Sequence, residues 1–289
     1  MAPISMHGLL TPIEPEPERE ARRHAVSRGV QASEAFYPTA SGRLAAAAAS
    51  SCGPHHAANE DTHSALAGSG RLFVVADGVG GGAMAQLASR LLVAHLHEAL
   101  RDGTPAAAAV AAAMLAADRV IAVAIARVTE LPGAATVALC APLDPAAASW
   151  LVAWVGDCRV YRWSPAASRL ECLTRDDSFG QLGEAPPPGG SADDPARMVG
   201  NGATGGANCA LHTLAPRELL AVCSDGVHKY LDGADWRRAL AEPRPLLQRC
   251  QALVARARAN GSGDDATLLL VERQGRERHR GAVAERTAP

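Results

Sequence analysis

The chain has 289 residues and a formal net charge of −2, with 28 Lys and Arg against 30 Asp and Glu. This balance lacks the basic surface of nucleic-acid-binding proteins, so we expect no nucleic acid partner. Hydrophobic residues make up 48% of the chain, enough for a sizeable buried core. No charge-free apolar run of about eighteen residues and no N-terminal secretion signal is present, so we expect a cytoplasmic location and no membrane partner. We also expect a monomer.

The two ends of the chain differ from its middle. Residues 1–42 are rich in Pro, Glu, Arg and Ser and show no apolar period, which predicts a mobile N-terminal extension, with a docking segment as the alternative. Residues 274–289 have the same character and predict a disordered C-terminal tail. No linker interrupts the pattern between them, so residues 43–273 are expected to form one domain.

The first predicted elements of this domain are two strands and two helices. Leu44–Ser51 is a strand of small residues, and Leu72–Ala76 is an apolar strand that we expect to end at Asp77. Helical spacing of leucines predicts a helix over Ala83–Leu100, and a second helix follows over Pro105–Thr129. Two helices in series are typical of an antiparallel pair lying on a sheet.

Strands dominate the next part of the chain. Ala134–Cys140 and Trp150–Val155 are apolar runs separated by a turn that contains proline. Arg159–Trp163 begins only a few residues later, which predicts a tight hairpin with the preceding strand. After a further short strand at Glu171–Leu173, the stretch Phe179–Ala207 is rich in Gly and Pro, and a loop of this length is usually functional or mobile.

The last elements are a strand at Leu219–Cys223, an amphipathic helix over Pro243–Ala259 and a strand at Ala266–Glu272. Because strands and paired helices occur without strict β-α-β alternation, the order of elements predicts an α+β domain with antiparallel sheets.

Acidic residues stand beside several of these strands. Asp77, Asp157 and Asp225 each follow an apolar run, Asp264 precedes the last strand, and Glu60-Asp61 lies shortly before the first helix. Any one Asp beside Gly is more simply a turn residue. Strands in a common core, however, bring their ends to shared edges, so these carboxylates could converge.

Convergent carboxylates repel one another unless a cation compensates them. All-oxygen coordination selects Mg²⁺ or Mn²⁺ over zinc. Gly78 would permit close backbone approach, so its carbonyl could be a further ligand. Two such ions sharing a bridging water would generate a hydroxide and clamp the oxygens of a phosphoryl group. The residues therefore predict metal-assisted phosphate chemistry.

Seven short motifs then occur in order: Asn59-Glu60-Asp61, Val74–Gly82, Gly133–Thr136, Val155–Arg162, Leu173–Ser178, Cys223–Val227 and Gly263–Thr267. Together they resemble the protein phosphatase 2C (PPM) family of metal-dependent Ser/Thr protein phosphatases, particularly its bacterial members. The resemblance implies a sandwich of two antiparallel β-sheets flanked by pairs of antiparallel helices. It also implies hydrolysis of phosphoserine and phosphothreonine in phosphoprotein substrates by direct attack of a metal-bridging hydroxide, opposing a Ser/Thr kinase.

The same resemblance assigns the metal ligands. Asp77 would bridge two Mn²⁺ or Mg²⁺ ions, with the Gly78 carbonyl on one of them. Asp225 and Asp264 would complete the shell of the first ion, and Glu60 would hold the second directly or through water.

Three further roles follow from the resemblance. Asp61 would support Glu60, while Asp157 and Asp225 would be available to a third, weaker metal site. The stretch Phe179–Ala207 falls where the family carries a mobile flap beside the active site.

Several positions depart from the family pattern. Many members have an arginine four residues before the Glu of the first motif, whereas this chain has His56, which either contacts the substrate phosphate or is a loop histidine without a role. Val79 replaces the His of eukaryotic members. Asp265 replaces a common Asn and either tightens metal binding or faces solvent. For His228-Lys229 we favour a solvated helix start over substrate contact.

The leading hypothesis is an active protein phosphatase. The alternatives are a catalytically silent, phosphatase-like binding module and a metal-dependent nuclease or cyclase. The last lacks a basic surface, and the glycines at 78 to 82 are not a P-loop because no Gly-Lys-Ser/Thr follows them.

Overall fold

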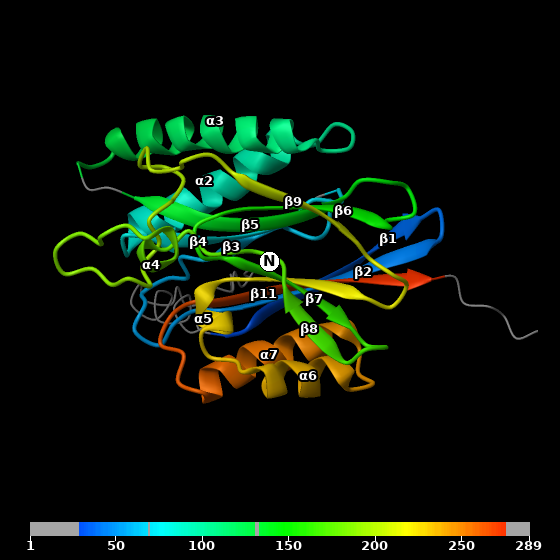
Figure 1. The fold of residues 1–289 in the computed structure, drawn as a ribbon. Helices are drawn as coiled ribbons and strands as arrows, with labels where there is room; N and C mark the ends of the chain where they lie inside the picture. Colours follow the sequence, from blue (N-terminus) through cyan, green and yellow to red (C-terminus); the bar gives the residue numbers. More distant parts are fainter. Residues whose placement is uncertain (1–28, 69, 131–132, 276–289) are drawn as a thin grey trace, which may run out of the picture.

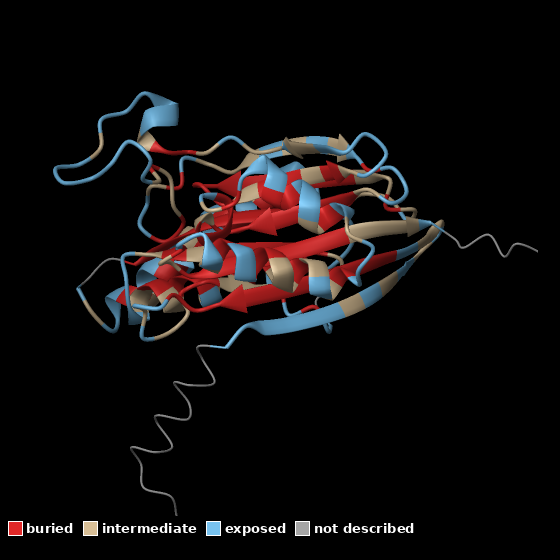
Figure 2. Cartoon of the chain, turned by 90° about the horizontal axis from the view of Figure 1, so that it is seen from below, coloured by how far each residue is buried: buried red, intermediate tan, exposed pale blue. Residues whose placement is uncertain are grey.

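The computed structural model describes residues 29–68, 70–130 and 133–275. Two antiparallel sheets stack face to face, and helices cover the outer face of each (Figure 1). Residues between the sheets and under the helices are buried, whereas exposed residues lie on the outer helix faces and on the first strand (Figure 2). The predicted α+β sandwich of two antiparallel sheets with flanking helices is confirmed.

One sheet has six strands. In spatial order these are β1 (Gln31–Thr39), β2 (Gly42–Ser51), β11 (Ala266–Gly275), β10 (Leu219–Cys223), β7 (Arg159–Ser164) and β8 (Arg169–Cys172). Helices α6 (Gly233–Ala241) and α7 (Leu246–Ala259) cover it. Alternate residues of β2 face in opposite directions, so Ala47 packs under α7 and Ala48 faces the other sheet. Its alanines let the helix approach closely, and the Cys250 Sγ lies 3.7 Å from the Ala47 carbonyl.

The other sheet has five strands. Their order is β3 (Thr62–His63), β4 (Phe73–Val79), β5 (Ala134–Pro142), β6 (Ser149–Val155) and β9 (Asn208–Thr213). Helices α2 (Ala83–Ala99) and α3 (Ala107–Ala126) lie over it, and two short helices are α4 (Phe179–Leu182) and α5 (Asp225–His228). Leu92, Met114 and Ile121 from the helix pair are fully buried in this layer.

Among the described residues, α3 is the one helix that is long and apolar enough to cross a membrane by length and composition. Here it packs on the sheet through Met114 and Ile121, while Leu115 and Val123 are exposed on its other side. Core helices of soluble proteins share this composition.

The domain begins before the predicted boundary at residue 43. Strand β1 pairs with β2 over its whole length, from Gln31 opposite Ser50 to Thr39 opposite Gly42. Most of its side chains are exposed, and so its sequence carries no apolar period. The predicted tail also starts too early, because β11 runs to Gly275. The rest of the predicted extension, residues 1–28, and of the tail, residues 276–289, lies outside the described residues.

The predicted hairpin between Trp150–Val155 and Arg159–Trp163 is wrong. Strand β6 pairs with β5 and β9, whereas β7 pairs with β8 and β10 in the other sheet. The link between them therefore carries the chain from one sheet to the other. Gly156 makes this crossing with φ 94°, and a Cβ there would stand 2.4 Å from the Thr136 side chain. Asp157 is thereby placed between the two sheets.

Strand β4 also differs from its prediction. It continues past Ala76, and Asp77 and Gly78 pair with Thr136 and Ala135 of β5. Asp77 is thus fixed by the ladder of the sheet and is not part of a turn. Other elements without a strong apolar period were not predicted, namely β1, β3, β9, α4 and α6.

Candidate metal centre

The predicted acidic residues converge at one end of the sandwich. Asp77 is on β4, Asp157 follows β6, Asp225 follows β10 and Asp264 precedes β11, so both sheets contribute. Burial raises the pKa of Asp77 well above its usual range, and the charges of Asp61, Asp225, Asp157 and Asp264 raise it further. The convergence predicted from strand ends is therefore present.

Gly78 is required by the close approach of two backbone segments. A Cβ at this position would lie 2.3 Å from the carbonyl oxygen of Ala85 in α2 and 2.9 Å from that of Glu60. No side chain fits there, and the first turn of α2 and the Glu60 segment can come against β4. The role of the Gly78 carbonyl as a metal ligand stays a prediction.

Two carboxylate oxygens in the cluster are buried without a hydrogen-bond partner, Oδ1 of Asp61 and Oδ1 of Asp225. The other oxygen of Asp61 accepts a hydrogen bond from the Ser224 hydroxyl at 2.7 Å. Burial raises the pKa of Asp61 to about 8. Buried polar atoms are normally satisfied, because leaving them unpaired costs free energy. Unpaired carboxylate oxygens in an acidic cluster are what a hard divalent cation would satisfy, so the residues fit the expected metal.

The side-chain carboxylate of Glu60 lies at the N-terminus of α2. Its Oε1 accepts a hydrogen bond from the Gly82 backbone N–H at 2.5 Å, and Gly82 is the N-cap of that helix. The helix dipole favours a negative charge at this end. Burial nevertheless raises the pKa of Glu60, because the carboxylate is partly removed from water.

Asp265 does not face solvent, so that half of its prediction is wrong. Its side chain is 1% exposed and accepts hydrogen bonds from the backbone N–H groups of Gly53 and Glu60, both at 2.6 Å. The Nδ1 of His56 lies 3.1 Å from the same carboxylate. Asp265 therefore anchors the loop that carries both His56 and Glu60.

His56 stands beside the acidic cluster, with its Nε2 3.9 Å from Oδ1 of Asp264. Ligand atoms of His56, Asp264 and Asp265 lie within 4.8 Å of one another, a spacing that could hold a metal ion. The Asp264 side chain is 45% exposed, so this side of the cluster opens to solvent. Contact of His56 with substrate phosphate stays a prediction.

Lys229 is the main site residue that the sequence analysis missed. Its Nζ donates to Oδ2 of Asp225 at 2.8 Å and to Oδ2 of Asp157 at 3.3 Å. The available signal was the spacing, because residues four apart share one side of a helical turn. His228 is buried, with its Nε2 3.0 Å from the Asp157 carbonyl, and burial lowers its pKa to about 4. The predicted solvated helix start is therefore wrong for His228.

The long segment Phe179–Ala207 is fixed to the rest of the domain by contacts just before it and within it. Just before it, Asp177 accepts hydrogen bonds from the Gly156 N–H at 3.0 Å and from the Asn208 amide. Within it, Val199 forms a bridge with Ala135 of β5. The segment is therefore joined at Val199 to the sheet that carries Asp77, and its mobility stays a prediction.

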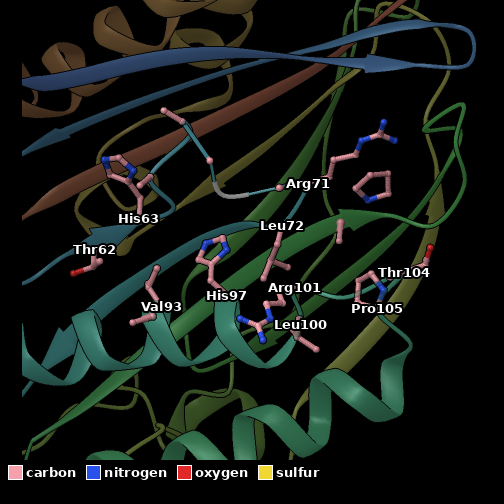
Figure 3. A pocket seen from close by; sticks show the side chains of 18 of the residues that line it. Thr62, His63, Arg71, Leu72, Val93, His97, Leu100, Arg101, Thr104 and Pro105 are labelled. Atoms are coloured by element: carbon pink, nitrogen blue, oxygen red, sulfur yellow. The ribbon is translucent and has the colours of Figure 1, made fainter.

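One large cavity lies away from the acidic cluster. It has a volume of about 880 Å³ and lies beside α2, lined by Thr62, His63, Arg71, His97 and Arg101 among others (Figure 3). None of the converging carboxylates lines it. The site is therefore assigned from its charged groups and not from cavity size.

Comparisons with known proteins agree with this geometry. Residues 67–274 match the family model described as stage II sporulation protein E (SpoIIE). The structure of PppA, described as a key regulatory component of T6SS in Pseudomonas aeruginosa, is 26% identical, with a TM-score of 0.65 and coverage of 79% of this chain and 97% of its own. A comparison with curated proteins finds no match.

Two further structures have the same fold. The serine/threonine phosphatase PstP/Ppp of Mycobacterium tuberculosis is 24% identical, with a TM-score of 0.69 and coverage of 80% of this chain and 99% of its own. The catalytic domain of PstP in complex with two manganese ions is 25% identical, with a TM-score of 0.67 and coverage of 79% and 97%.

Proposed function

The chain belongs to the SpoIIE family of phosphatase 2C-type (PPM) proteins, and from this we propose that it is a metal-dependent phosphatase of phosphoserine and phosphothreonine in proteins. The observation that carries the proposal is the convergence of Asp61, Asp77 and Asp225 with two buried, unpaired carboxylate oxygens. A silent binding module has no need of such a cluster, because charge repulsion would only destabilise it.

Two Mn²⁺ or Mg²⁺ ions are the proposed cofactors. Asp77 would lie between them, Asp225 and Asp264 would hold one, and Glu60 would hold the other with support from Asp61. The PstP structure with two manganese ions supports this number. When bound, such ions lower the pKa of a water molecule and draw negative charge from the phosphate oxygens.

Neighbouring side chains hold the proposed metal ligands in position. Ser224 holds Asp61 through its hydroxyl, and Asp265 holds the backbone of Glu60, so both carboxylates enter the site in fixed positions. Preorganisation of this kind lowers the cost of reaching the transition state. His56 lies beside Asp264 on the open side of the cluster, where an incoming phosphate would arrive, and is the proposed phosphate contact.

The proposed substrates are phosphoproteins, and the proposed partner is a Ser/Thr kinase whose phosphorylation this protein reverses. Support comes from the serine/threonine phosphatase of Mycobacterium tuberculosis, which has the same fold. A cytoplasmic location, as expected from the sequence, is part of the proposal.

The test is hydrolysis of a phosphothreonine peptide and of p-nitrophenyl phosphate by the purified chain with Mn²⁺. Turnover should disappear with EDTA and in Asp225→Asn. Absence of turnover in a folded protein with Mn²⁺ demonstrably bound would refute the phosphatase and favour a binding module.

A further inference from the structure

Lys229 is the only lysine of the chain, and its ammonium lies between two carboxylates of the acidic cluster. One helical turn separates it from Asp225, because the Lys229 backbone N–H donates to the Asp225 carbonyl at 3.0 Å. The second carboxylate, Asp157, comes from the crossing between the two sheets. Lys229 therefore links the helical turn that carries Asp225 to the crossing segment that carries Asp157.

This ion pair differs from an ordinary surface pair. Exposed pairs spaced by four residues contribute little to stability. Asp157, however, is only 3% exposed, and a buried carboxylate needs a partner of opposite charge. The Lys229 side chain is 40% exposed, so its stem reaches inward from solvent to place one charge on the buried acid.

The same two carboxylate oxygens could not serve a metal ion at the same time. A divalent cation binds carboxylate oxygens at about 2.0 to 2.6 Å. Nζ already lies 2.8 Å from Oδ2 of Asp225 and 3.3 Å from Oδ2 of Asp157. An ion on both oxygens would meet the ammonium at contact distance, where the two positive charges repel.

We propose that the Lys229 ammonium takes the place of a third metal ion between Asp157 and Asp225, so that this protein binds two divalent ions and not three. The proposal rests on the proposed metal-dependent function. It assigns to Asp157 the role of a partner for Lys229, in place of the third metal site expected from the family resemblance. A tethered charge at this position is present at any metal concentration.

The test is the number of Mn²⁺ ions bound per chain, measured by equilibrium dialysis with electron paramagnetic resonance of the free ion. The wild-type chain should saturate at two, and Lys229→Ala should bind a third, weaker ion. Lys229→Arg is the matched control that keeps the charge and should remain at two. Lys229→Ala combined with Asp157→Asn should return the number to two, because one of the two ligands is lost.

Thermal unfolding supplies a second readout that does not depend on activity. In EDTA, Lys229→Ala should have a lower Tm than wild type because Asp157 loses its partner, and saturating Mn²⁺ should raise its Tm by more than it raises that of wild type. Should Lys229→Ala not fold, Lys229→Gln keeps most of the stem without the charge and is expected to bind three ions.

The outcomes separate this proposal from the proposed function. Three ions on the wild-type chain, or two on folded Lys229→Ala and Lys229→Gln, would overturn the role of Lys229 and leave the phosphatase intact. A folded wild-type chain that binds no Mn²⁺ would overturn both.

Discussion

One side of the acidic cluster is neutralised by a lysine of the protein, whereas its centre is not. On one side the carboxylates of Asp157 and Asp225 share the ammonium of Lys229. In the centre, burial and neighbouring acids raise the pKa values of Asp61 and Asp77, and neither carboxylate forms an ion pair with a cationic side chain among the described residues. On the first side the protein itself supplies the positive charge that the carboxylates need, whereas the centre is destabilised by repulsion between its own acidic groups. We infer that the centre is built for function at the expense of stability.

Asp77→Asn, in the centre of the cluster, is expected to have the largest effect on activity. Asp77 is the proposed ligand of both ions. Mutation of a residue that only hydrogen-bonds to a metal ligand typically lowers activity about 10- to 100-fold, so loss of Asp77 itself should lower phosphatase activity more than about 100-fold. The same change removes a charge that its neighbours repel, so the Tm in EDTA should rise. Peptide turnover and thermal unfolding in EDTA are the measurements.

Asp193→Asn is the matched control, because that carboxylate is exposed in the long segment and should leave both values unchanged. A lower Tm for Asp77→Asn in EDTA would contradict the destabilised centre.

Asp265→Ala should lower the free energy of unfolding by about 2 to 6 kcal/mol. Two buried backbone N–H groups, of Gly53 and Glu60, would lose their acceptor, and each such loss costs about 1 to 3 kcal/mol. Mn²⁺ affinity should fall as well, because Glu60 is no longer held. Urea unfolding and Mn²⁺ titration measure the two effects, and a loss below about 0.5 kcal/mol, typical of surface positions, would contradict the anchoring role.

Stability without metal should fall as the pH rises from about 6.5, where the buried His228 no longer opposes the trend, to about 8. Burial raises the pKa of Asp157 to about 6 and that of Asp61 to about 8. The folded chain therefore keeps protons that the unfolded chain releases above a pH of about 4, and raising the pH favours unfolding. Urea unfolding in EDTA across this range measures the slope. A free energy of unfolding that increases steadily to pH 8 would contradict the prediction.

The smallest effect is expected from His56→Ala. Loss of one hydrogen bond to phosphate, worth about 0.5 to 1.5 kcal/mol, should raise KM for a phosphothreonine peptide about 2- to 12-fold with kcat nearly unchanged. His55→Ala is the control, because that neighbouring ring is exposed and enters no described ion pair. An unchanged KM would contradict the contact of His56 with phosphate and leave it only its contact with Asp265.

Buried strands were well predicted because both faces of each strand lie in a core. Leu219–Cys223 is buried at every position, and its apolar run coincides with β10. Strand β1 gave no such signal, because backbone pairing with β2 holds it while most of its side chains face solvent. Strand pairing was harder still. The short link at Gly156 resembles a hairpin in sequence, and only the packing of two sheets turns it into a crossing.

The sequence by itself determined the acidic residues and their places beside the strands, because strand ends and hydrophobic runs are local features. It also determined the family, through motifs that occur in order. Only the tertiary structure decided what neutralises each carboxylate. Lys229 and Asp157 are 72 residues apart in the chain, and Asp265 and Gly53 are 212 apart. Such partners meet because strands distant in the chain pair in one sheet, β2 with β11 and β7 with β10, which no local pattern records.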